Sequence, residues 1–213
     1  MLGVQKVSSA PERVIATPAT GPLTEADRDF VVEVRSAGLW EYPVGRLALR
    51  KGTTKAVKLA GEHLVDGQAS LDAASRNVAG RLDITLPNQP SPQQQGFVTT
   101  LKTDSGKRFD TDMATILRAT DGPFLSTIAS VRTTTRNSLV RALADQVNDI
   151  VLDHVDVLEK TGLVDFGQVL VQETTASKLA PQEVTPPPPV PGQPQVVLTP
   201  PATSTLSPSP SAG

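Results

Sequence analysis

The chain has 213 residues, of which 38% are hydrophobic, 20% charged and only 3% aromatic. This length and composition suit one globular domain with additional tail, and a second full domain is not expected. The net charge of −2 comes from 20 basic and 22 acidic residues scattered along the sequence. Nucleic-acid binding is therefore not expected, because it requires clustered Lys and Arg. The absence of cysteine excludes disulfides, thiol catalysis and zinc sites with thiolate ligands.

Both ends of the chain differ in composition from its middle. Residues 1–22 are rich in Pro, Ala, Thr and Ser and are expected to form a flexible leader. They lack the apolar core of a signal peptide, and no apolar run is long enough to span a membrane. Residues 182–213 contain VTPPPPVPGQPQ and SPSPSAG, which predict a proline-rich, disordered tail. This tail suits a spacer, or an attachment to a cell wall or protein partner.

Two long amphipathic patterns follow the leader. The first covers residues 24–51, where Thr24 and Asp27 form an acidic variant of the capping box that begins helices. Pro43 predicts a kink, because proline removes one backbone hydrogen bond and crowds the preceding turn. The second pattern covers residues 54–83.

One short and two long helical patterns complete the series. A proline-rich connection leads into a short helix at about 91–104. The third long pattern covers residues 109–131, and the Gly-Pro pair at 122–123 is expected to interrupt it. The fourth covers residues 137–161, with Asn137 as its N-cap.

The predicted fold is all-α, since Leu, Val, Ile and Ala supply almost the whole core. Residues 23–166 are expected to form a kinked four-helix bundle with up-down-up-down order. The short extra helix lies between its second and third long helices. Residues 167–181 are expected to be a partly ordered extension.

Each inward-facing apolar stripe carries one polar residue near its middle. These residues are Glu41, Gln68, Asp121 and His154. Residues at mid-helix lie at similar heights in a bundle, so the four side chains are expected to converge in the core. An ionised carboxylate is seldom buried unless it is paired or binds something.

One or more of these residues could point to solvent, because helix phase read from sequence can slip by a residue. If they do face the core, two interpretations of the polar group stay open. In the first, His154 pairs with Glu41 or Asp121, and Gln68 completes a buried hydrogen-bond network. In the second, the group binds one divalent metal ion, either Fe, Mn or Zn, because carboxylate and imidazole from facing helices are the ligands that bundle proteins use. In that case Gln68 would be a weak fourth ligand.

The sequence gives no support for catalysis. Glu62 and His63 are adjacent rather than three residues apart, so they do not form the Glu-x-x-His pair of a di-iron helix. The chain also lacks nucleophile-elbow, phosphate-loop, dinucleotide and zinc-protease motifs.

Four stretches together resemble a known family. They are LWEYPVGRLA at 39–48, LPNQPSPQQQGF at 86–97, GKRFD at 106–110 and DHVDVLEKTGLVDF at 153–166. Over residues 23–166 the chain resembles the bacterial ferritin-like family described only as domain of unknown function 4142. The resemblance implies a ferritin-like four-helix bundle. It also implies a place outside the cytoplasm, in the cell envelope, because members typically carry an N-terminal signal or anchor.

The resemblance also implies particular site residues. Glu41 matches the inward glutamate of the family, and His154 matches its late histidine. Gln68 and Asp121 stand where members usually have histidines, so this chain is expected to bind metal more weakly or to prefer a different ion.

Three functional hypotheses result. The first is an envelope-associated helical bundle with a binding or structural role. The second is a mononuclear metal-binding protein that uses the inward Glu, Asp and His residues. The third, ranked last, is a metal-dependent oxidase.

Overall fold

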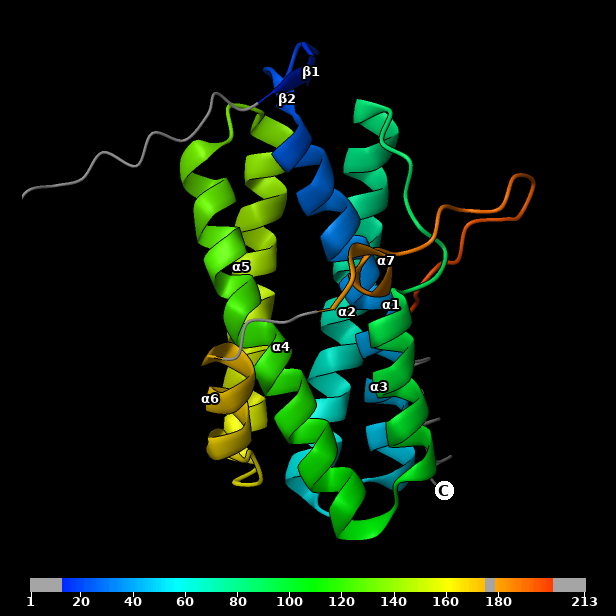
Figure 1. Ribbon diagram of the computed structural model, residues 1–213, viewed down its shortest axis with the longest axis vertical. Coiled ribbons are helices and arrows are strands. Elements are labelled where there is room, and N and C mark those ends of the chain that lie inside the picture. Colours follow the sequence, from blue (N-terminus) through cyan, green and yellow to red (C-terminus); the bar gives the residue numbers. More distant parts are fainter. Residues whose placement is uncertain (1–12, 175–178, 201–213) are drawn as a thin grey trace, which may run out of the picture.

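The computed structural model describes residues 13–174 and 179–200, and these parts of the chain are mostly helical (Figure 1). The four long helices are α1 (Glu25–Lys51), α2 (Lys55–Leu82), α4 (Gly106–Thr134) and α5 (Ser138–Lys160). The shorter helices are α3 (Pro92–Thr103), α6 (Phe166–Thr174) and α7 (Pro181–Val184). The all-α prediction is therefore confirmed. None of the described helices combines the length and the apolar character that crossing a membrane requires.

The helix ends follow local signals in the sequence. Thr24 and Asp27 form the predicted capping box at the start of α1, and Asn137 caps α5 by accepting from two backbone N–H groups. The prediction that residues 122–123 interrupt the third long helix was wrong, because α4 continues through Pro123. Proline removes one hydrogen bond from the helix, and packing of the flanking turns against neighbouring helices outweighs that loss.

The long helices form two pairs, α1 with α2 and α4 with α5 (Figure 1). At one end, Ser138 N–H donates to the carbonyl of Thr20 at 2.8 Å, so the α4–α5 turn lies beside the start of α1. At the other end, Thr53 N–H donates to Asp110, near the start of α4, at 3.2 Å. Helices α2 and α4 therefore begin at the same end and run parallel.

The predicted up-down-up-down order was consequently wrong. Residues 83–105, which contain α3, return along the length of the molecule (Figure 1). This long connection brings the start of α4 back to the end where α2 begins. The result is two antiparallel pairs joined by one crossover, an arrangement that helical bundles adopt when a connection is long.

Helices α1 and α2 approach most closely where each has a glycine. A Cβ atom on Gly61 would lie 2.8 Å from Cβ of Ala48 and 2.9 Å from the carbonyl oxygen of Gly45. A Cβ atom on Gly45 would in turn lie 3.0 Å from the carbonyl oxygen of Gly61. The two backbones touch here, and no larger residue fits without separating the helices.

Two apolar clusters form the core, one toward each end of the molecule. The first includes Phe30, Val34, Leu71, Ile128, Val147 and Val151. The second includes Trp40, Val44, Leu64, Leu117, Val157 and Leu158. The buried polar residues singled out in the sequence, one on each long helix, lie in a layer near the middle of the molecule, and this layer contains the candidate site.

The described part of the leader is structured. Strand β1 (Val14–Ala16) pairs antiparallel with β2 (Leu23–Thr24), so the prediction of a flexible leader is wrong for residues 13–22, while residues 1–12 lie outside the described chain. Gly21 has φ 107°, and a Cβ atom there would lie 2.2 Å from the carbonyl oxygen of Arg136. Only glycine fits this contact, which joins the leader to the α4–α5 turn.

The described part of the tail also contacts the bundle. The predicted disorder of residues 182–213 is wrong for residues 182–200, because Leu198 is only 8% exposed and helix side chains bind the backbone on either side of it. In Figure 1 the chain after α7 projects outward and then returns to the body. Residues 175–178 of the predicted extension and 201–213 of the predicted tail lie outside the described chain.

Candidate metal centre

The four polar residues singled out in the sequence lie in one layer of the core. Glu41 on α1, Gln68 on α2, Asp121 on α4 and His154 on α5 are at most 4% exposed. Each long helix supplies one of them because all four positions fall near mid-helix, between the two apolar clusters. The structure thus brings Glu41, Asp121 and His154 together, with Gln68 bonded to Glu41.

Three of the four residues lie close enough together to hold a metal ion. Glu41, Asp121 and His154 each offer one ligand atom, and these atoms all lie within 4.8 Å of one another. Nδ1 of His154 is 3.7 Å from Oε2 of Glu41, too far for a hydrogen bond. Two carboxylates and an imidazole are a donor set for a hard or borderline divalent cation.

Gln68 takes a different position from the one expected of a ligand. Its Nε2 donates to Oε2 of Glu41 at 2.5 Å, so the amide holds a carboxylate of the site. Its Oε1 lies on the side of Gly38, 3.2 Å from where a Cβ atom of that glycine would be. Gln68 therefore orients Glu41, the role that residues behind a metal ligand commonly have.

Several polar atoms of the site have no hydrogen-bond partner among the described residues. They are Oδ2 of Asp121, both ring nitrogens of His154 and Oε1 of Gln68. Each such buried group costs about 1–3 kcal/mol when it is left unpaired. A closed hydrogen-bond network is thus only partly formed, since the Gln68–Glu41 bond stands alone. Oδ2 of Asp121 and Nδ1 of His154, the ring nitrogen on the side of Glu41, fit a bound cation, whereas Nε2 faces α2 at Gly67.

The charges of the site are strongly affected by burial. Burial, with a smaller contribution from the Asp121 charge, raises the pKa of Glu41 well above its usual range. Burial also raises the pKa of Asp121 to about 7, against a lowering effect of Arg118. For His154, burial lowers the pKa to about 4. At neutral pH the imidazole is therefore uncharged and able to bind a metal, and burial favours the protonated form of the carboxyls, from which a metal would displace protons.

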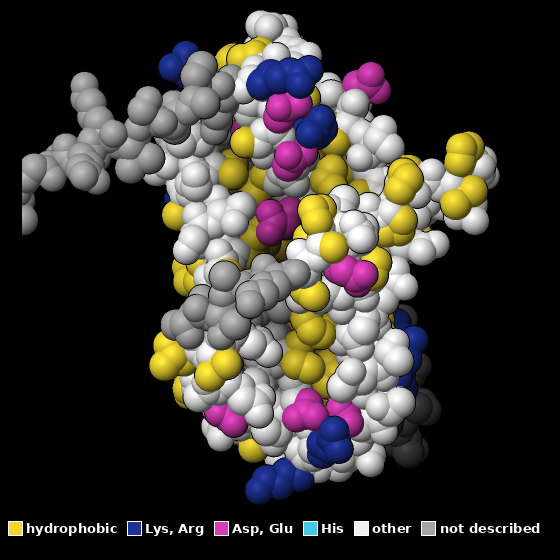
Figure 2. All heavy atoms as spheres, viewed as in Figure 1, with side chains coloured by type: hydrophobic (Ala, Val, Ile, Leu, Met, Phe, Trp, Pro, Cys, Tyr) yellow, Lys and Arg dark blue, Asp and Glu magenta, His cyan; other side chains and the backbone are white. Residues whose placement is uncertain are grey.

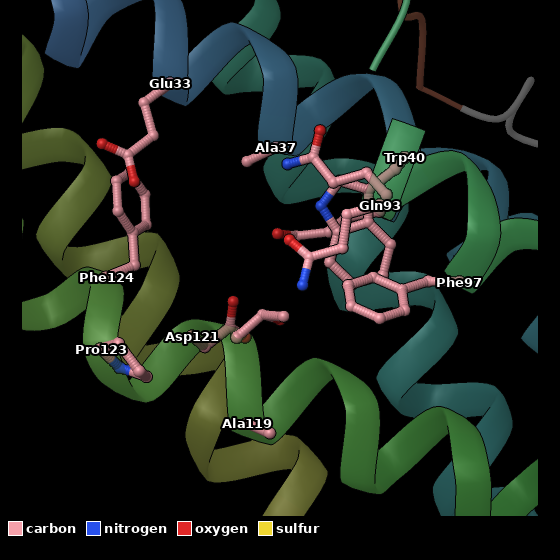
Figure 3. A pocket seen from close by; sticks show the side chains of 12 residues that line it. Glu33, Ala37, Trp40, Gln93, Phe97, Ala119, Asp121, Pro123 and Phe124 are labelled. Carbon is pink, nitrogen blue, oxygen red and sulfur yellow. The ribbon is translucent and has the colours of Figure 1, made fainter. Parts of the chain in front are cut away.

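A pocket of about 210 Å³ connects the site with the surface. Its lining includes both carboxyl groups, Glu41 and Asp121, together with Glu33 and residues of α3. Figure 3 shows Asp121 at the edge of the space between α1 and α4, with Trp40 and Phe97 on the opposite side. Acidic and apolar side chains also gather around the middle of this face in the space-filling view (Figure 2). A cation could reach the carboxyl groups along this pocket.

On the α2 side, a glycine makes room for the imidazole. A Cβ atom on Gly67 would lie 2.5 Å from Nε2 of His154 and 2.8 Å from Cγ2 of Ile150. The chain's second histidine, His63, lies outside the layer and pairs with Asp153 at 2.7 Å. The two histidines thus have different environments, and only His154 faces the carboxyl groups.

The sequence did not identify the residues around the site. The pocket residues Gln93 and Phe97 belong to α3, and no periodic pattern shows that α3 lies against α1 and α4. Gly67 carried a usable signal, since glycine next to an inward polar residue in mid-helix indicates a close approach by another group.

The fold and the site together define a helical protein with a buried carboxylate and imidazole cluster. Comparison with protein families shows a match to Domain of unknown function (DUF4142) over residues 12–161, and the chain belongs to this family. The search found no match among curated proteins and none among solved structures.

Proposed function

We propose that this protein binds one divalent metal ion, Mn²⁺ or Fe²⁺ before Zn²⁺, through Glu41, Asp121 and His154. The observation that carries the proposal is the cluster of three buried ligand atoms within 4.8 Å of one another, two of whose residues have unpaired polar atoms. Two carboxylates match the charge of a divalent ion, and oxygen-rich sites favour Mn²⁺ and Fe²⁺.

The arrangement of the helices supports a ferritin-like fold for this site. Ferritin-like bundles have two antiparallel helix pairs and one long crossover, and they bind metal between facing helices. The parallel course of α2 and α4, set by the crossover through α3, agrees with that plan. The proposed role is binding, and no oxidase step is assigned. A place in the cell envelope remains a proposal that rests on the family resemblance.

Metal content tests the proposal directly. Protein prepared without a histidine tag, stripped with chelator and incubated with Mn²⁺, is expected to retain about one ion per chain by elemental analysis. His154→Ala and Glu41→Gln are each expected to lose nearly all of it. His63→Ala is the matched control, because it removes the other histidine outside the layer. Equal uptake by wild type and His154→Ala would refute the proposal and favour a structural network.

Gln68→Ala separates orientation from ligation. The variant is expected to keep one ion per chain but to bind it about 10-fold to 100-fold more weakly, because Glu41 loses the donor that holds it. Titration calorimetry measures both quantities. If Gln68→Ala no longer bound one ion per chain, Gln68 would be identified as a ligand of the metal instead.

Gly67→Ala is expected to weaken Mn²⁺ binding by about tenfold or more. The new methyl group would overlap Nε2 of His154 and Cγ2 of Ile150, so the imidazole must leave its present position beside the carboxyl groups. Calorimetric titration gives the affinity. Gly80→Ala provides the control, because it makes the same change in α2 at a position with nothing within 4 Å; equal affinities of the two variants would show that His154 does not depend on Gly67.

A further inference from the structure

The segment 194–199 lies extended against α1, α2 and the connection after α2, and it is held through its backbone. Five hydrogen bonds join it to helix and loop side chains. They run from Asn88 Nδ2 to Pro194 O (3.3 Å), Val196 N to Asn88 Oδ1 (3.1 Å), Arg35 Nη2 to Val196 O (2.8 Å), Leu198 N to Asp72 Oδ2 (3.1 Å) and Tyr42 OH to Thr199 O (2.7 Å). Recognition through the backbone of alternate residues is typical of extended peptides.

One side chain of the segment is anchored in the body of the protein. Leu198 is 8% exposed, whereas its neighbour Val197 is 52% exposed. Cδ1 of Leu198 is 3.3 Å from the place where a Cβ atom of Gly38 would be. The missing side chain of Gly38 therefore creates the space for the leucine, beside Oε1 of Gln68.

The groups that bind the segment are built into the core. The side chains of Arg35 and Asp72 are both fully buried and form an ion pair. Arg76 donates to Asp72 at 2.9 Å, and Arg35 donates to the carbonyl of Pro87 at 3.2 Å. The pair still directs one guanidinium N–H and one carboxylate oxygen toward the segment. Charged groups are rarely buried in this way unless they are paired and hydrogen-bonded.

We propose that this groove is a peptide-binding site for an extended segment with a leucine anchor, and that residues 194–199 of the same chain are its resident, exchangeable occupant. The attraction of five hydrogen bonds and one buried leucine is comparable with the entropy lost when six residues become ordered. Connection to the same chain raises the local concentration of the segment and keeps it bound. Because these two contributions nearly cancel, residues 194–199 can leave the groove and another peptide can take their place.

Binding of a peptide in trans tests the proposal on the full chain. The probe is the peptide QPQVVLTP, residues 193–200, measured by titration calorimetry. Leu198→Asp is expected to release the resident segment, so this variant should bind the peptide at least tenfold more tightly than wild type, whose groove is occupied. Val197→Asp is the matched control, because that side chain already points to solvent, and it should behave as wild type.

Two further variants define the groove. The same peptide with aspartate in place of its leucine is expected not to bind. Adding Asn88→Ala to Leu198→Asp removes two backbone contacts and is expected to weaken peptide binding about tenfold. Failure of the folded Leu198→Asp chain to bind the peptide would overturn the proposal.

Amide exchange in the wild-type chain gives an independent test. The N–H groups of Val196 and Leu198 are bonded to side chains, so they are expected to exchange more slowly than the N–H of Val197, by about tenfold or more. Uniformly fast exchange across the segment would overturn the proposal. A dimer that Leu198→Asp dissociates would show that the occupant comes from a second copy and would overturn binding within one chain.

Discussion

Gly61→Ala is expected to lower the free energy of unfolding by about 2–3 kcal/mol. The new methyl group would lie 2.8 Å from Cβ of Ala48 and 2.9 Å from the carbonyl oxygen of Gly45. Neither of these two α1 atoms can move by a change of side-chain rotamer. The clash can therefore be relieved only by moving α1 away from α2. That movement would loosen the packing of the neighbouring apolar side chains.

Gly80→Ala is the matched control in the same helix. Gly80 is exposed, with nothing within 4 Å of its missing Cβ, so alanine is expected to raise stability by about 0.5–1 kcal/mol through helix propensity. Urea denaturation measures both variants. If both substitutions changed the free energy of unfolding in the same direction, the close approach of α1 and α2 at Gly61 would be contradicted.

The destabilisations caused by Gly45→Ala and Gly61→Ala should not add up in the double variant, because one separation of α1 from α2 relieves both clashes.

The metal-free protein is expected to become less stable as pH rises from 6.5 to 8. Asp121 has a pKa of about 7 in the folded protein, above its ordinary value of 3.8, and the pKa of Glu41 is raised as well. The folded chain therefore holds more protons than the unfolded chain, and the free energy of unfolding falls as pH rises through these values. The expected loss over this interval is about 1 kcal/mol or more.

His154 acts in the opposite direction, but only at lower pH. Its pKa falls from 6.5 to about 4 on folding, so the unfolded chain holds more protons and stability rises with pH between these values. This gain opposes the loss from the carboxyls below pH 6.5. Above pH 6.5 the His154 contribution fades while the loss from the carboxyls continues, which makes the interval from 6.5 to 8 the informative one.

Thermal denaturation in chelator measures this dependence. Asp121→Asn is expected to flatten the decline, because it removes one of the two carboxyls of the site whose pKa is raised. Added Mn²⁺ is expected to reverse the slope, since the ion binds the deprotonated carboxylates and stabilises the folded state more at higher pH. A metal-free stability that rises from pH 6.5 to 8 would show that the carboxyls are not held in the protonated state.

Features that follow from hydrophobic periodicity, namely the long helices and the inward-facing polar residues, were predictable from the sequence. The stripes of apolar residues located the four long helices, and Glu41, Asp121 and His154 were found because they break those stripes at mid-helix. Helix phase places a residue toward the core, whereas the direction in which an amide points depends on its neighbours. Gln68 therefore lies in the right layer but holds Glu41 instead of facing the cluster.

Features that depend on contacts far apart in sequence were not predictable. The parallel course of α2 and α4 follows from where α3 packs, and the order of helix patterns carries no such information. Proline-rich composition predicted a disordered tail, but Arg35 and Asp72 bind the backbone of residues 194–199. Contacts to the backbone do not depend on the side chains of the segment, so amino-acid composition does not reveal them. The only sequence signal in the segment is Leu198, the residue whose side chain is buried.

The position of Trp40 gives the candidate site its own optical reporter. This residue is the only tryptophan in the chain, is 1% exposed and lines the pocket with Glu41. Its ring contacts Phe97 with centroids 5.4 Å apart. All indole emission from the protein therefore originates at the wall of the pocket. A paramagnetic ion or a small molecule that enters will change the intensity and wavelength of that emission, so occupancy can be followed in unlabelled protein.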